Sequence, residues 1–214
     1  MQKRARAQEI LRRLKRTYKV RGPFVKWRNP LELLIGTVLS AQCTDRRVNI
    51  VTKTLFTKYK TARDYANAKL LTLQKEIYST GFYKTKAKYL QGIGRALVER
   101  YGGNVPDNFE SLVSLPGVAR KTANLIMAKA FRNPTGIAVD THVSRIAPRL
   151  WLTKSKTPDA MARDLEKLYV PKDYLDVNEY FIMHGRATCT PKPQCPSCIL
   201  NDICPSAKQF YPRA

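Results

Sequence analysis

Four cysteines lie within sixteen residues near the C-terminal end of the chain, in the spacing C-x5-C-x2-C-x5-C: Cys189, Cys195, Cys198 and Cys204. Several prolines interrupt this segment, so it cannot form a continuous helix and is free to wrap a metal centre. A structural zinc ribbon usually brings two C-x2-C pairs from separate turns, whereas this segment has one such pair with a cysteine on each side. The spacing therefore favours a [4Fe-4S] cluster over a zinc ion, and paired disulfides rank behind both.

A second group of residues, which could bind a ligand, surrounds a tight turn. Leu115-Pro116-Gly117-Val118-Ala119 is typical of a turn between two helices, because Gly117 can adopt a backbone conformation closed to other residues. The following helix would present free N–H groups and its positive dipole end there, which can bind a phosphate without reading sequence. An ordinary helical hairpin is the alternative, and the positive charge of the chain favours phosphate binding.

Two side chains near this turn could take part in covalent chemistry. Lys121 lies on the first helical turn, where the helix dipole and Arg120 both disfavour a charged amine, and a Schiff-base nucleophile must be neutral. A surface or phosphate contact is the alternative in a chain with 39 basic residues. Asp140 follows an apolar segment and could stabilise a cation, shuttle a proton or only cap a helix. For His142 a structural or phosphate-side role is favoured over a catalytic one.

The charge of the chain points to a polyanionic partner. Lys and Arg number 39 against 16 Asp and Glu, which gives a net charge of +23. Residues 1–28 contain eleven basic residues and one acidic residue, so the excess is also clustered. This pattern favours nucleic acid over a membrane surface. No apolar run approaches the ~20 residues of a spanning helix, and no signal-peptide core is visible.

The elements that position these residues are predicted to be helices nearly throughout, so the fold class is all-α. Apolar residues at helical spacing over 7–14 predict a first helix, Asn29-Pro30 starts another, and Asp45 is expected to cap a third. Further helices are expected over Leu70–Ser79, Thr85–Tyr101, Asn108–Ser114, Arg120–Arg132, Thr141–Trp151, Pro158–Tyr169 and Tyr174–Ala187.

Six segments together carry a family resemblance that covers essentially the whole chain: Leu39-Ser40-Ala41-Gln42, Gly81-Phe82-Tyr83, residues 115–123, Val139-Asp140-Thr141-His142-Val143, His184-Gly185-Arg186 and the four cysteines. They resemble the endonuclease III family of helix-hairpin-helix DNA glycosylases. The resemblance implies two helical domains with the active site in the cleft between them. One is a barrel-like domain over residues 23–134 that contains the helix-hairpin-helix motif. The other joins residues 1–22 to 135–214 and holds the [4Fe-4S] cluster loop.

Position by position, the resemblance implies a role for each matched residue. Lys121 matches the family's nucleophile and Asp140 its catalytic carboxylate. Gln42 matches a residue that enters the space left by a flipped base, and Phe82 matches a wedge beside it. The four cysteines match the cluster ligands. Further DNA contacts are implied for the hairpin and the helix after Asp140, at Gly117, Val118, Ala119, Arg120 and His142.

The chain departs from the family pattern at two places, and Phe82 is a further position of note. Ala119 stands where the hairpin usually has a second glycine, and its methyl group could alter the approach to phosphate. The first cysteine spacing is five residues where six is common, which leaves zinc open. Phe82 stands where an aliphatic residue is frequent, and its ring could stack on a base as well as wedge it.

We therefore predict a bifunctional DNA glycosylase and abasic-site lyase that removes oxidised pyrimidines and cuts 3′ to the lesion by β-elimination. The expected partner is duplex DNA with damaged bases or abasic sites, bound by a monomer without any membrane partner, in a prokaryotic cytoplasm near the nucleoid. One alternative is a mismatch glycosylase for adenine or thymine, although those often lack a lysine at position 121. A non-catalytic DNA-binding module is the other, and the presence of both Lys121 and Asp140 counts against it.

Overall fold

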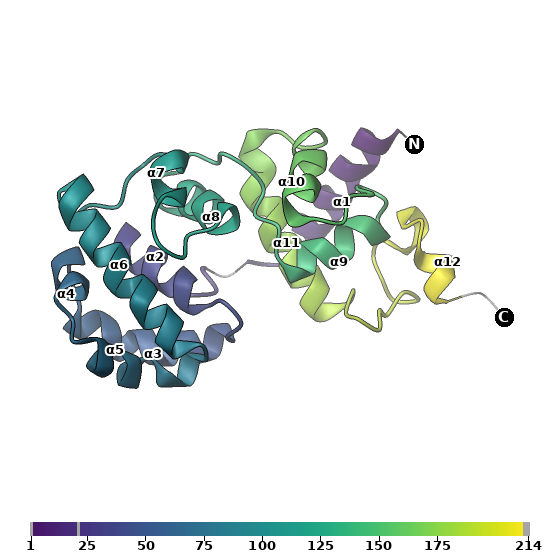
Figure 1. Cartoon of the computed structure of the whole chain (residues 1–214). Helices are drawn as coiled ribbons and strands as arrows, with labels where there is room; N and C mark the ends of the chain where they lie inside the picture. The colour runs from purple at the N-terminus through teal and green to yellow at the C-terminus, as the bar shows by residue number, and fades with distance from the viewer. Residues whose placement is uncertain (1, 21, 212–214) are drawn as a thin grey trace. The chain divides into compact units, whose positions relative to one another are not determined.

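The computed structural model describes residues 2–20 and 22–211, and every regular element within these ranges is a helix, as predicted. The chain divides into two compact units (Figure 1). Unit 2 is the continuous segment Gly22–Asn133, and unit 1 combines Met1–Arg21 with Pro134–Ala214. No helix of the described ranges is both long enough and apolar enough to cross a membrane.

Unit 2 is built around its longest helix, α6 (Tyr83–Tyr101), which contacts several of the other helices of this unit. The helices are α2 (Pro30–Leu39), α3 (Asp45–Lys58), α4 (Ala62–Ala66), α5 (Leu70–Glu76), the 3₁₀ turn η1 (Tyr78–Thr80), α6 (Tyr83–Tyr101), α7 (Phe109–Val113) and α8 (Arg120–Ala130). The buried stripe of α6 includes Leu90, Ile93 and Leu97, at the spacing of one helix face. Helix α6 packs against α2, α4 and α5, so these helices share one core.

Most helix ends in unit 2 follow local rules that the sequence carries. The predicted start at Asn29-Pro30 is confirmed, because the Asn29 side chain accepts a hydrogen bond from the Glu32 amide. The predicted end of α6 is also confirmed, since Gly102 and Gly103 have φ values of 59° and 86°. The expected cap of α3 was wrong: Thr44 accepts from the Arg47 amide, and Asp45 is already helical.

Other helix boundaries in unit 2 differ from the predictions. The segment predicted as Leu70–Ser79 is α5 up to Glu76, followed by η1. The short helix α4 was not predicted, although Thr61 and Asp64 form a reciprocal capping box at its start. Helix α4 lies so close to α6 that a methyl group on Gly94 would come within 2.5 Å of the Ala66 nitrogen. Close packing therefore stabilises a helix too short to be stable alone.

Unit 1 brings the N-terminal helix together with the C-terminal half of the chain. Its helices are α1 (Lys3–Thr17), α9 (Thr141–Arg149), α10 (Pro158–Glu166), η2 (Pro171–Asp173), α11 (Tyr174–Ala187), η3 (Asn201–Ile203) and α12 (Ala207–Phe210). Helix α1 packs against α11 (Figure 1). The apolar stripe predicted for the first helix is confirmed as a buried face formed by Ala7, Ile10, Leu11 and Leu14. The Tyr169 hydroxyl donates to the Ala7 carbonyl at 3.0 Å.

Two helices of unit 1 end earlier than predicted. Helix α9 stops at Arg149 because Trp151 adopts a left-handed backbone with φ 53°, and the Leu152 amide returns to the Ala147 carbonyl at 2.9 Å. Helix α10 stops at Glu166, three residues short of the predicted end. The Glu166 carboxylate accepts from the Ile137 amide at 3.0 Å, which fixes the extended segment that leads to Asp140.

Candidate active site and metal centre

The turn between α7 and α8 has the backbone that the sequence predicted. The Val118 amide donates to the Leu115 carbonyl at 3.1 Å, and Gly117 is exposed with φ 72°. A methyl group added to Gly117 would lie 2.4 Å from Cδ2 of Tyr89. Both the backbone conformation and the neighbouring ring therefore require glycine at this position.

Helix α8 starts without a side-chain cap. Ala119 is extended, with φ −83° and ψ 167°, and offers no side-chain acceptor to the first-turn amides. Ala119 and Lys121 are exposed, whereas Val118 is buried, so Val118 can present only its backbone to a ligand. The Arg120 guanidinium lies 5.2 Å from the centre of the Phe109 ring. The result is an open, positive helix start with the Lys121 amine on its first turn.

Gln42 and Phe82 line the same groove of unit 2. This groove has a volume of about 200 Å³ and also includes Lys86, Tyr89 and Gly117 in its lining. Gln42 and Phe82 both adopt left-handed backbones, with φ values of 52° and 48°, and Phe82 is 65% exposed. Side chains held in this backbone region are uncommon and gather at functional sites. The structure thus brings both predicted base-probing residues to the groove that contains the glycine turn.

Asp140 lies in unit 1, at the start of α9. Its Oδ1 accepts hydrogen bonds from the His142 and Val143 amides at 2.9 and 2.8 Å. Within residues 2–20 and 22–211 no hydrogen bond reaches Oδ2, and the carboxylate is partly exposed. One oxygen therefore caps α9 while the other can face a developing positive charge.

His142 is held between α9 and α11 within unit 1. Arg145 Nη2 lies 3.1 Å from His142 Nδ1 and donates to the Gly185 carbonyl at 3.0 Å. Because a guanidinium can only donate, His142 Nδ1 acts as the acceptor. Arg145 Nε also donates to the Cys189 carbonyl at 3.0 Å. These contacts fix the orientation of the His142 ring, and the predicted DNA contact of His142 stays a prediction.

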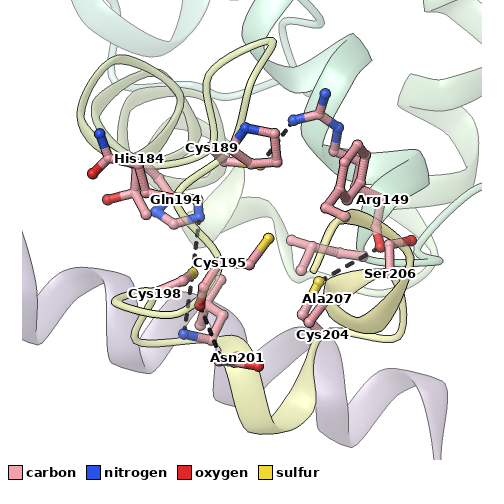
Figure 2. A pocket seen from close by; sticks show the side chains of 15 residues that line it. Arg149, His184, Cys189, Gln194, Cys195, Cys198, Asn201, Cys204, Ser206 and Ala207 are labelled. Atoms are coloured by element: carbon pink, nitrogen blue, oxygen red, sulfur yellow. Dashed lines mark hydrogen bonds between the residues drawn. The ribbon is translucent and has the colours of Figure 1, made fainter. Parts of the chain in front are cut away.

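The four cysteines surround one cavity in unit 1 (Figure 2). All four are free thiols in this structure. Arg149 Nη1 lies 3.4 Å from Cys189 Sγ, and the Leu200 amide donates to Cys198 Sγ at 3.4 Å. N–H groups that point at sulfur are suited to stabilise thiolate ligands.

Burial makes three of the four thiols poor anions on their own. Loss of contact with water raises the pKa of Cys198 to about 11 and raises the pKa values of Cys195 and Cys204 as well. Thiolates at these three positions therefore need positive charge from a bound metal. Among residues 2–20 and 22–211, no group of three or more Cys, His, Asp or Glu side chains is placed so that it could hold a metal ion.

The structure adds residues that the sequence analysis did not identify. Lys86 is buried in the Gln42 groove, and Arg145 and Arg149 reach from α9 to the cysteine loop. The position of Lys86 could have been noticed, because Lys86, Leu90 and Ile93 share one helix face on which a lysine is out of place. The two arginines left no comparable pattern, because their partners are backbone carbonyls distant in sequence.

Comparisons with known proteins agree with this geometry. The model of the HhH-GPD superfamily base excision DNA repair proteins matches residues 35–171. Endonuclease III of Synechocystis sp. (strain ATCC 27184 / PCC 6803 / Kazusa) is 46% identical over 207 residues, which cover 96% of this chain and 94% of the relative. This chain belongs to the endonuclease III family.

Two solved structures of the endonuclease III family resemble the whole chain. A non-covalent endonuclease III–DNA complex has a TM-score of 0.93 and 38% identity, with all of both chains covered. A trapped endonuclease III–DNA covalent intermediate has a TM-score of 0.92 and 38% identity, covering 98% of this chain and 99% of the other. Membership in the endonuclease III family makes the protein a bifunctional DNA glycosylase and abasic-site lyase of base excision repair.

Proposed function

We propose that this enzyme removes oxidised pyrimidines from duplex DNA and cuts the strand 3′ to the lesion through a Schiff base on Lys121. The observation that carries the proposal is the exposed Lys121 amine on the uncapped start of α8, next to the Gly117 turn. That helix start offers amides and positive potential to a DNA phosphate. A phosphate bound there would bring the adjacent sugar within reach of the amine.

In the proposed reaction, the damaged base first leaves the helical stack, at lower cost than a sound base because its stacking is weakened. The neutral Lys121 amine then attacks the anomeric carbon, and the bond from that carbon to the base breaks. The free Oδ2 of Asp140 stabilises the positive charge that develops on the sugar. Ring opening gives the Schiff base, and loss of a C2′ proton expels the 3′ phosphate.

Gln42 and Phe82 are proposed to hold the DNA open during this reaction. Their left-handed backbones and shared groove support a role as probes that enter the base stack. The exposed ring of Phe82 can stack on a base, and the amide of Gln42 can replace hydrogen bonds of the base that left.

Cys189, Cys195, Cys198 and Cys204 are proposed to hold a [4Fe-4S] cluster. Four free thiols around one cavity support this ligand set, and the spacing C-x5-C-x2-C-x5-C favours a cluster over a zinc ion. When bound, the cluster supplies the positive charge that stabilises the buried thiolates and fixes the loop that carries them. Purified protein should absorb broadly near roughly 400 nm and contain iron. Colourless protein with one zinc per chain would contradict the cluster.

The test of the function uses three duplexes with the full-length protein. One contains an oxidised pyrimidine, one a preformed abasic site, and one an adenine or thymine mismatch. Each is incubated with the protein and sodium borohydride, which reduces a Schiff base to a stable adduct. We expect adducts and strand cleavage with the first two duplexes. Excision from the mismatch alone, without an adduct, would favour the mismatch glycosylase instead.

The enzyme is proposed to act as a monomer in a bacterial cytoplasm.

A further inference from the structure

Lys86 is a buried lysine that the proposed reaction does not use. It lies in the first turn of α6 with 3% of its surface exposed. Its Nζ donates to the carbonyls of Leu39 and Thr80, each at 2.8 Å. None of the ion pairs within the described ranges includes Lys86. Burial lowers the pKa of Lys86, so the two carbonyls must offset the cost of a buried ammonium.

The two carbonyls belong to the ends of two separate elements. Leu39 is the last residue of α2, and Thr80 is the last residue of η1. Carbonyls at the C-terminal end of a helix lack partners within the helix and carry the negative end of its dipole. An ammonium is a suitable partner because it can donate in several directions at once. The Lys86 side chain therefore ties the end of α2 to the end of η1.

In both segments, a residue with a left-handed backbone follows these carbonyls within three residues. Gln42 follows Leu39 by three residues, and Phe82 follows Thr80 by two. A left-handed backbone is unfavourable for a residue with a side chain, so the surrounding structure must hold it. Lys86 lines the same groove as Gln42 and Phe82, and its two hydrogen bonds join the two segments.

We propose that Lys86 is a positioning residue that fixes the Gln42 and Phe82 segments relative to each other, so that both side chains enter the base stack as one unit. The proposal rests on the proposed DNA-opening role of Gln42 and Phe82. In this role Lys86 acts through the two segments and not on the sugar or the base. Its loss should therefore affect the opening of a paired lesion and spare the chemistry at a site that has already lost its base.

The test compares five proteins: wild type, Lys86→Met, Phe82→Ala, the double variant and the control Lys88→Met. Lys86→Met keeps the length of the side chain and removes its charge and donors. Lys88→Met is the matched control, because Lys88 is exposed on the same helix and its substitution removes the same charge. Single-turnover rates are measured for base excision from an oxidised-pyrimidine duplex and for cleavage of a preformed abasic duplex. Circular dichroism and thermal unfolding report whether each variant folds.

We expect Lys86→Met to slow base excision about tenfold and abasic cleavage about twofold or less, as a positioning role predicts. The double variant should be faster than the product of the two single losses predicts, because Lys86 acts partly through the segment that carries Phe82. Lys88→Met should leave the ratio of the two rates at the wild-type value. A 2-aminopurine placed beside the lesion should brighten less with Lys86→Met than with wild type.

Three results would overturn the proposal. Lys86→Met could slow both reactions equally, it could keep wild-type rates, or its loss in rate could add fully to that of Phe82→Ala in the double variant. If Lys86→Met does not fold, Lys86→Gln is judged by the same criteria, since its amide can still donate to one carbonyl. The underlying function is judged separately by Phe82→Ala in the wild-type background. If that variant does not slow base excision selectively, the DNA-opening role fails, whatever Lys86 does.

Discussion

Helices α8 and α9 begin 21 residues apart, and they differ in whether a side chain accepts hydrogen bonds from their first-turn amides. At α8, Ala119 offers no side-chain acceptor and the adjacent turn is glycine. At α9, the Asp140 carboxylate accepts two of the amides itself. The positive end of a helix attracts anions in either case. One end is thus left open for an external anion, while the other is occupied by an anion of the protein.

The two helix starts also place different chemical groups beside their first-turn amides. At α8 the exposed Lys121 amine lies next to amides that no side chain caps, so a bound phosphate and the proposed nucleophile would share one helix end. At α9 one oxygen of Asp140 caps the helix, and the other is left for the proposed stabilisation of a cation.

Replacement of the amine on the open helix start should have the largest effect. Lys121→Gln keeps helix propensity and much of the side-chain length but cannot form a Schiff base. We expect complete loss of borohydride trapping and of strand cleavage, measured on gels with the abasic duplex. DNA affinity, measured by fluorescence anisotropy, should stay within about threefold of wild type, because the hairpin amides remain. A trapped adduct at wild-type yield would mean that another amine is the nucleophile.

Replacement of the Asp140 carboxylate by an amide should separate the effect of its charge on base release from its effect as a helix cap on stability. Asp140→Asn should slow base release about 100- to 1,000-fold, the usual effect of losing one preorganised electrostatic contact. Stability should change by less than about 1 kcal/mol, because Asn caps helices nearly as well as Asp. Single-turnover excision and thermal unfolding measure the two effects. A large fall in stability with little change in excision would reduce Asp140 to a structural cap.

Addition of a methyl group to the hairpin should have a moderate effect on binding. Gly117→Ala must displace the Tyr89 ring and crowds the approach to phosphate, so we expect about tenfold weaker DNA binding. Gly103→Ala is the control, since Gly103 also has a positive φ but a methyl group there meets no atom within 4 Å. This control should lose stability and keep its affinity. Equal affinities of the two variants would argue against a role of the hairpin in binding.

The smallest expected effect is a change in salt dependence. With a net charge of +23, wild-type affinity should fall with salt at a log–log slope of about −4 to −6, as for five to seven neutralised phosphates. Loss of one phosphate contact in Gly117→Ala should reduce the steepness by about one. Anisotropy titrations across a range of salt concentrations measure both slopes. Affinity that does not depend on salt would contradict the electrostatic account.

Features encoded by local rules could be predicted from the sequence. Examples are the Asn29-Pro30 helix start, the glycines that end α6 and the Gly117 turn, because caps and positive φ values depend on residue type. The segment of α4 carried a readable capping box at Thr61 and Asp64, but its five residues lack an apolar period. Its helix depends on contact with Gly94, which is distant in sequence.

The shape of the candidate site was harder to predict than its residues. Resemblance identified Gln42 and Phe82, yet nothing in either side chain predicts a left-handed backbone. That conformation depends on neighbouring elements, and Lys86 joins two of them through carbonyls that every residue has. Likewise, four cysteines in sequence predict a metal site, but the N–H groups directed at their sulfurs come from Arg149 and Leu200.

Because unit 1 combines both ends of the chain, its parts leave the ribosome at different times. Helix α1 emerges first, but the partners of its apolar face, including Tyr169 and α11, emerge only after all of Gly22–Asn133. At typical elongation rates this delay is on the order of ten seconds. Unit 2 can fold as it leaves the ribosome, whereas α1 must wait with Ile10 and Leu14 uncovered. The many arginines and lysines on the other face of α1 would keep the nascent segment in solution during that interval.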